Sequence, residues 1–193
     1  MLATTPILEG PRVRLVPNTL DHDAALFDQT PEDTFRYFLS APAAWNPDAF
    51  ASHMRAHREN PKSRVFTVID RASGAVVGSS SYMDIDPKNR CVEIGSTWYA
   101  AAARGTAVNP ECKLLLLEHA FGILDCVRVM LKTDERNLHS QRAITKLGAV
   151  REGVLRAHRI TSSGYVRNTV MFSVIAAEWP VVREQLAARI KAG

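Results

Sequence analysis

The strongest apolar pattern along the chain predicts one long buried helix that begins at Asn109 or Pro110. Asn109, Pro110 and Glu111 follow the order of an N-cap residue, a first-turn proline and a first-turn acid. Beyond them, apolar residues recur at the spacing of a helix face. This face comprises Val108, Cys112, Leu115, Leu116, His119, Ala120 and Ile123, widened by Leu114, Leu117, Phe121 and Leu124. We expect this helix to lie inside the molecule.

Alternating apolar and polar residues predict strands on both sides of this helix. The predicted strands are residues 12–16, 65–70, 75–85, 91–99, 127–133, 150–160 and 165–175. Further helices are predicted at residues 21–28, 50–58 and 137–147, the last closed by Gly148, and a terminal helix starts at Trp179 and Pro180. Because a strand, the long helix and another strand follow one another, we expect a parallel pair at the centre of an otherwise mostly antiparallel sheet.

Residues 30–47 are predicted to be a loop, and they contain Phe35, Tyr37, Phe38 and Trp45. Such a segment is either a lid over a pocket or a loop packed on the core, and the sequence slightly favours packing. His53 and His57 lie one turn apart in the next predicted helix, a spacing found in metal sites. No third ligand is near them in sequence, so we interpret them as part of a solvated face.

Composition indicates one ordinary globular domain. The chain has 193 residues, of which 46% are hydrophobic and 23% charged, and no repeat marks a boundary. We predict a single domain over residues 1–193, with a core at about 10–176 and a C-terminal helix at 177–192. The net charge of +4 favours anionic ligands, but the basic residues are scattered, which argues against nucleic acid.

The cysteines and the N-terminus suggest a cytoplasmic protein. Cys91, Cys112 and Cys126 are odd in number and lack the spacing of a zinc or redox motif, so we interpret them as reduced packing residues. The first residues do not resemble a signal peptide, and no apolar run is long enough to span a bilayer. We expect no membrane association. The terminal helix is either part of the core or a homodimer contact.

The loop before the long helix is basic and built of small residues, Ala101-Ala102-Ala103-Arg104-Gly105-Thr106-Ala107-Val108. Arg104 supplies a fixed positive charge, while Gly105 and Ala107 keep bulk low where a ligand must approach the backbone. Free amides at a helix N-terminus attract anions. A second polar helix start, Asn137 to Arg142, follows the next predicted strand. Both starts are expected at the sheet edge where the parallel strands end.

These motifs resemble those of the GNAT superfamily of acetyl-CoA-dependent N-acetyltransferases, in the branch that includes ribosomal-protein N-terminal acetyltransferases. The resemblance covers roughly residues 10–176. It rests on Glu93-Ile94-Gly95, on Arg104 to Asn109, and on Asn137-x-x-Ser140-x-Arg142-x-x-x-Lys146-x-Gly148, the most specific motif. It implies an α/β fold, a GNAT-like mixed and mostly antiparallel central sheet of about seven strands flanked by helices.

The resemblance also implies acetyl-CoA as co-substrate, no metal, and a set of cofactor contacts. Thr97, Trp98 and Tyr99 would line the pantetheine, and the loop after them would hold the phosphates. The full implied set is Thr97, Trp98, Tyr99, Arg104, Gly105, Thr106, Ala107, Val108, Asn109, Asn137, Ser140 and Arg142. Trp98 and Tyr99 are alternatively core aromatics, and Arg142 and Lys146 are alternatively a solvated face.

Three positions depart from the family pattern. Ala107 stands where the family prefers glycine, and Asn109 where it has glycine or alanine. Ala107 requires an ordinary φ, whereas Asn109 both caps a helix and tolerates the left-handed region. Related N-terminal acetyltransferases tend to carry a carboxylate base in the strand after the Asn-x-x-Ser helix, and Arg159 occupies that position here.

Direct attack of an amine on a thioester needs a neutral amine and a proton for the leaving thiolate, without a covalent enzyme intermediate. Ser140 is the candidate proton donor by resemblance, or else an exposed helix residue, and Asn137 is also a candidate N-cap. Glu93 is a candidate base through water or a cross-strand ion-pair partner. His158 is the other candidate base, or an exposed strand residue. No activating environment is visible for Cys91 or Cys126 as nucleophile.

The leading hypothesis is an acetyl-CoA-dependent N-acetyltransferase that acts on a primary amine, either a protein N-terminus or a small molecule. Ordinary pKa values leave roughly a tenth of α-amines but under one in a thousand lysine side chains neutral at pH 7. A site without an obvious base therefore suits an α-amine better than lysine. The alternative is a catalytically weak acyl-CoA-binding regulator, and a third reading is a nucleic-acid-binding module.

Overall fold

The fold of residues 4–192 is described by a computed structural model. One sheet of 8 strands, in the order β1-β2-β3-β4-β5-β6-β8-β7, runs through the molecule. Its strands are β1 (Leu8–Glu9), β2 (Val13–Pro17), β3 (Arg64–Asp70), β4 (Val76–Asp86), β5 (Cys91–Tyr99), β6 (Arg128–Asp134), β7 (Val150–Ile160) and β8 (Val166–Ile175). Only β5 and β6 are parallel neighbours among the described strands. The predicted sheet is confirmed, with the short β1 added.

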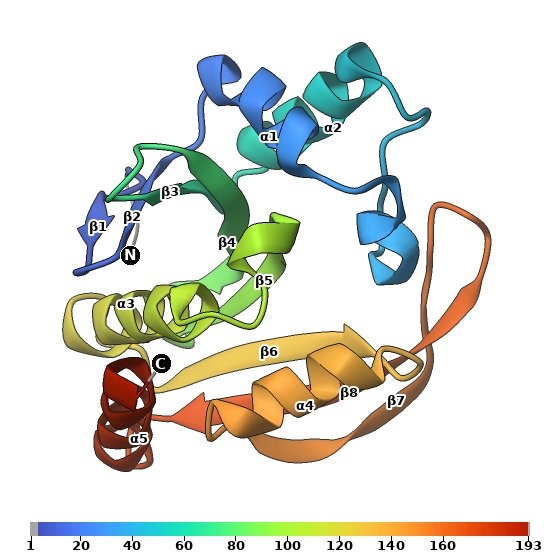
Figure 1. The fold of residues 1–193 in the computed structure, drawn as a ribbon. Helices are drawn as coiled ribbons and strands as arrows, with labels where there is room; N and C mark the ends of the chain where they lie inside the picture. Colours follow the sequence, from blue (N-terminus) through green and yellow to red (C-terminus); the bar gives the residue numbers. More distant parts are fainter. Residues whose placement is uncertain (1–3, 193) are drawn as a thin grey trace.

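Helices cover both faces of the sheet (Figure 1). The α-helices are α1 (Asp23–Gln29), α2 (Pro47–Glu59), α3 (Val108–Gly122), α4 (Leu138–Lys146) and α5 (Trp179–Ala192). Short 3-10 helices are η1 (Leu20–His22), η2 (Glu32–Tyr37) and η3 (Ala101–Ala103). The larger apolar core joins α3, α4 and α5 to one sheet face, and a smaller cluster joins α1, η2 and α2 to Val65 and Trp98 on the other. None of the described helices is both long and apolar enough to cross a membrane.

The long helix α3 is buried as predicted, but its start and one end residue differ. It begins at Val108 after Ala107 and has no side-chain hydrogen bond at its N-cap, so the prediction that Asn109 caps it is wrong. Cys112 and Leu116 are fully buried against the sheet. Ile123, predicted on the buried face, is 75% exposed because it follows the last helical residue, where the helical spacing no longer applies.

Candidate active site

The central parallel strands form a fork. β5 and β6 pair only at Cys91, Val92 and Glu93, and beyond Glu93 no pairing joins them. On its other side β5 stays paired with β4 as far as Tyr99, and β6 stays paired with β8 along its whole length. The two halves of the sheet therefore separate toward the C-terminal ends of β5 and β6, as Figure 1 shows.

A bulge in β5 accompanies the separation. Ser81 pairs with Gly95 and Ser79 with Trp98, so β5 contains one more residue than β4 between these pairs. Ser96 has φ 46°, in the left-handed region that a serine rarely adopts. A bulge of this kind bends its strand and leaves a residue outside the ladder. The bend turns the end of β5 away from β6.

The loop after β5 places free amides at the mouth of the fork. Gly105 has φ 77°, which glycine adopts without strain. Thr106 Oγ1 donates to the Ala103 carbonyl at 2.7 Å and accepts from the Val108 amide at 3.2 Å, which fixes the approach to α3. Within the described chain, the amides without a hydrogen-bond acceptor here include Gly105, Thr106, Ala107 and Asn109. An anion at this helix start would find donors that no side-chain cap occupies.

Arg104 is exposed and lies beside the end of β5. Its Nε donates to the Tyr99 carbonyl at 2.9 Å, which leaves the outer guanidinium nitrogens for a ligand. The side chains of Trp98 and Tyr99 are buried in the two apolar clusters, at 6% and 8% exposure. Thr97 Oγ1 accepts from Lys113 Nζ at 2.6 Å. The core reading of Trp98 and Tyr99 is thus confirmed, and in the fork it is their backbone that could face a ligand.

The second helix start has the predicted cap. Asn137 Oδ1 accepts from the Ser140 amide at 3.0 Å. Ser140 is half-buried, and among the described residues its hydroxyl has no hydrogen-bond partner. Arg142 is exposed further along α4. Gly148 has φ 94° directly after the helix C-cap, which confirms its predicted role. Because α4 follows β6 and α3 follows β5, both helix starts lie at the open end of the fork.

Glu93, the last residue of β5 that pairs with β6, belongs to a charged cluster. Lys132 Nζ on β6 lies 2.7 Å from a Glu93 carboxylate oxygen and 2.7 Å from an Asp84 oxygen. Glu93 is 8% exposed, and this burial raises its pKa. The hydrogen bond from Lys132 lowers the pKa of Asp84. The interpretation of Glu93 as a cross-strand ion-pair partner is confirmed. Its partner Lys132 was not among the residues predicted from sequence, because Asp84 and Glu93 lie on other strands and no nearby residue indicates the pairing.

His158 and Arg159 lie close to this cluster. Burial lowers the pKa of His158, and the charges of Arg159, Lys132 and Arg167 lower it further. His158 Nδ1 is buried with no hydrogen-bond partner among the described residues. The structure therefore brings Glu93 and His158 to one region of the sheet, whereas Ser140 comes from the helix start beyond β6.

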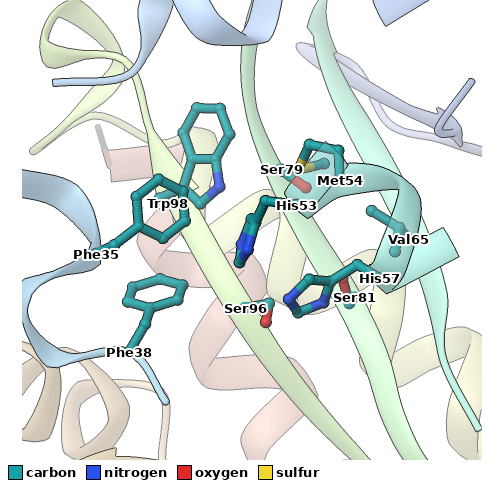
Figure 2. Close-up of a pocket in the computed structure, with 10 residues that line it drawn as sticks. All are labelled: Phe35, Phe38, His53, Met54, His57, Val65, Ser79, Ser81, Ser96 and Trp98. Atoms are coloured by element: carbon teal, nitrogen blue, oxygen red, sulfur yellow. The ribbon is translucent and has the colours of Figure 1, made fainter. Parts of the chain in front are cut away.

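Aromatic rings and two histidines line a pocket on the face of the sheet covered by α2 (Figure 2). Its lining residues are Phe35, Phe38, His53, Met54, His57, Val65, Ser79, Ser81, Ser96 and Trp98. The enclosed space between them is small, about 10 Å³, which is about the room that one water molecule needs. Figure 2 places His53 between the Phe35 and Trp98 rings and the bulge residue Ser96. The pocket thus reaches β5 where the strand turns away from β6.

The histidine pair is not on a solvated face as predicted. Their ring centroids are 4.7 Å apart, and the Phe35 ring lies 5.1 Å from His53. Burial lowers the pKa of His53 to about 4 and also lowers that of His57, so both rings are neutral at pH 7. The prediction failed because residues 30–47 fold over α2, a long-range contact. Within residues 4–192, no cluster of three or more potential metal ligands is present.

The three cysteines are free thiols, of which Cys112 and Cys126 are buried and Cys91 is partly exposed. Burial raises the pKa of Cys112 to about 12 and that of Cys126 to about 11, and it also raises that of Cys91. A protonated thiol is a weak nucleophile. This agrees with the interpretation of the cysteines as packing residues.

Comparisons with known proteins agree with this geometry. A family model described as an acetyltransferase (GNAT) domain matches residues 12–150. A crystal structure from T. thermophilus, described as an acetyltransferase, has 36% sequence identity and a TM-score of 0.92, covering 98% of this chain and 100% of its own. A GCN5-related N-acetyltransferase from Brucella melitensis has 31% identity and a TM-score of 0.88, covering 96% of this chain and 85% of its own.

A more distant structure shares the fold. RimJ of Mycobacterium smegmatis, in complex with CoA-disulfide, has 20% identity and a TM-score of 0.76, covering 95% of this chain and 93% of its own. At this identity the likeness shows the fold alone. A search of curated proteins gave no match.

Proposed function

Because this chain belongs to the GNAT family of acetyltransferases, we propose that it transfers the acetyl group of acetyl-CoA to a primary amine. The observation that carries the proposal is the fork between β5 and β6. At the open end of this fork lies the N-terminus of α3, whose amides are free. An extended pantetheine can pair with unpaired backbone along one arm of the fork. The pyrophosphate then meets donors at the N-terminus of α3.

The proposal gives each part of the fork a role. The backbone of Thr97 to Tyr99 pairs with the pantetheine, and Arg104, the amides up to Asn109, and Arg142 bind phosphate. The CoA-disulfide complex of RimJ, which has the same fold, supports CoA as the occupant. Asn137 caps the start of α4. The free hydroxyl of Ser140 lies near the thioester of acetyl-CoA, where it can donate a proton.

The chemistry is one substitution at the acetyl carbonyl. The amine nitrogen attacks the carbonyl carbon, a C–N bond forms, the C–S bond breaks, and the nitrogen loses a proton. Ser140 donates a proton to the departing thiolate. Glu93, through water, and His158 are the candidate bases. The salt bridge to Lys132 favours the ionised, proton-accepting form of Glu93, while its burial raises the pKa toward the working pH.

Ser140→Ala provides the test. We expect it to lower kcat by roughly a hundred-fold or more, as for a lost general acid, with little change in acetyl-CoA affinity. Thiol release over a panel of amines measures kcat, and calorimetry measures affinity. His139→Ala, at the exposed neighbouring position, is the matched control.

Two other outcomes have clear meanings. Wild-type turnover in Ser140→Ala would remove Ser140 from the mechanism. Tight acetyl-CoA binding without acetylation of any amine would favour the regulator, which the arginine at position 159 also supports.

A further inference from the structure

Two arginines oppose each other across the β7–β8 hairpin without a counter-ion. Arg159 pairs in register with Arg167, a relation that places Cβ atoms about 4.5–5.5 Å apart on the same face of a sheet. Like charges placed directly opposite destabilise a sheet. In the part of the chain that the structure describes, neither arginine has a carboxylate at ion-pair distance. The pair therefore forms no ion pair among the described residues, although the charge of Arg159 contributes to lowering the pKa of Asp84.

Arg167 is the more informative of the two because it is buried. It is 5% exposed, and its Nη1 donates to the Tyr37 carbonyl at 3.3 Å. Its Nε is buried with no partner among the described residues. Arginine stays protonated in proteins, so both its charge and this unpaired donor persist inside the molecule. A buried donor without an acceptor costs free energy that a ligand oxygen would recover.

The nearby carboxylates are already committed to other cations. Asp134 lies 2.8 Å from Arg136, which it contacts through both oxygens. Glu93 and Asp84 share Lys132. The charges of Asp134 and Glu93 act on Arg167, so they lie near it, but neither forms an ion pair with it. This region of the sheet therefore has an excess of positive charge beside Glu93.

The arginine pair adjoins the aromatic pocket. Tyr37, whose carbonyl binds Arg167, directly precedes Phe38 in the pocket wall. No acidic side chain lines that pocket among the described residues. Ser81 also lines it, and the Ser81 hydroxyl is buried without a partner in the described part of the chain. The arginine pair therefore borders an apolar region that supplies no carboxylate to it.

We propose that Arg159 and Arg167 bind the carboxylate of the acceptor, and that this acceptor is a free amino acid. The carboxylate lies at the β7–β8 hairpin, and the amine faces Glu93 at the fork. A peptide N-terminus fits less well, because its first carboxyl group is a neutral amide. This inference rests on the proposed function, since it names the acceptor of the same site.

Matched ligands test the carboxylate directly. CoA-saturated protein is titrated by calorimetry with phenylalanine, phenethylamine, which lacks only the carboxylate, and phenylalanine amide, in which the carboxylate is neutral. Leucine and isopentylamine form a second pair. We expect the amino acids to bind roughly ten- to hundred-fold more tightly than their partners, as one charge-assisted hydrogen bond would give. Equal affinity within both pairs, or no binding of either amino acid, would overturn the proposal.

Variants tie the preference to the arginines. Arg159→Gln changes an exposed side chain and should remove most of the preference for phenylalanine over phenethylamine without unfolding the protein. Arg167→Gln should do the same. Arg151→Gln is the control, on the same strand but roughly 26 Å away at 3.3 Å per residue, and it should behave as wild type. If Arg159→Gln and Arg167→Gln keep the wild-type preference for phenylalanine over phenethylamine, these arginines do not bind the carboxylate.

The readouts separate this inference from the proposed function. If the protein acetylates phenethylamine as fast as phenylalanine, the proposed carboxylate site is wrong, while the proposed acetyltransferase activity is supported. If acetyl-CoA does not bind, the proposed function is wrong. Titration of phenylalanine against phenethylamine without CoA then still decides whether the arginine pair binds a carboxylate.

Discussion

At the scale of single residues, Lys113 on α3 is buried without a carboxylate. Its side chain is 5% exposed, and Nζ donates to Thr97 Oγ1 at 2.6 Å and to Ser80 Oγ at 3.3 Å. Neither hydroxyl carries charge, so burial lowers the pKa of Lys113 to about 8. Lys113 thereby connects α3 to β4 and β5 next to the bulge, at the cost of a charge inside the core.

Lys113→Met should stabilise the protein at neutral pH. The folded pKa lies below the unfolded value of 10.5, so the unfolded chain binds more protons between about pH 8 and 10.5. Below pH 8 both states are charged, and the full penalty, on the order of 3 kcal/mol, is present. The variant's gain over wild type should therefore be largest at pH 7 and shrink toward pH 10.5.

Urea unfolding at each pH measures this difference. Lys88→Met, at an exposed turn, is the control and should show no such trend. A gain that is the same at pH 7 and pH 10.5 would contradict the assignment to the buried charge.

At the scale of elements, the two helix starts at the open end of the fork differ in how their amides are satisfied. Asn137 caps α4 through its side chain, whereas α3 has no side-chain cap. Capping stabilises a helix by satisfying amides that a ligand would otherwise bind. The start of α3 therefore has free amides, which the proposed function assigns to phosphate, and the start of α4, which carries Ser140, is capped.

Arg104→Glu should weaken acetyl-CoA binding by about ten-fold or more, because it removes a charged donor and places like charge beside phosphate. Calorimetric titration of acetyl-CoA measures the effect. Arg55→Glu makes the same change at an exposed position on α2 and is the control for net charge. Equal affinities for Arg104→Glu and Arg55→Glu would show that the loop does not bind the cofactor.

At the scale of the whole molecule, the segment of residues 30–47 joins the two halves of the forked sheet. Phe35 is buried against α2, which confirms that the segment packs on the core. Its middle reaches the β7–β8 hairpin, where the Ser162 amide donates to the Leu39 carbonyl at 2.9 Å. Arg136 stacks 3.5 Å from the Tyr165 ring centroid and 5.7 Å from that of Tyr37. The segment thus lines the pocket while it contacts both the α2 side and the β7–β8 hairpin.

Tyr165→Ala should loosen this segment, since it removes the ring on which Arg136 stacks. Amide hydrogen exchange in η2 and the residues up to Leu39 should become faster, while α3 keeps its protection. Tyr165→Phe retains a ring and should behave as wild type. Unchanged exchange in Tyr165→Ala would mean that other contacts hold the segment.

The sequence by itself determined the features that depend on neighbours along the chain. Strand alternation, helix faces, the cap at Asn137 and the glycine at 148 all involve groups within a few residues of one another. The GNAT motifs were readable for the same reason, because each is a short continuous segment such as Arg104 to Asn109. The fold and the candidate cofactor loop therefore followed from local pattern.

Only the tertiary structure decided which distant side chains meet. Lys132 reaches Glu93 from another strand, and Arg159 opposes Arg167 because the register of the hairpin places them together. A shift of one residue in register moves every side chain to the opposite face, and the bulge at Ser96 makes such a shift within β5. Long-range register and bulges are set by the packing of whole elements, so neither the contact of Lys132 with Glu93 nor that of Arg159 with Arg167 was contained in any single stretch of sequence.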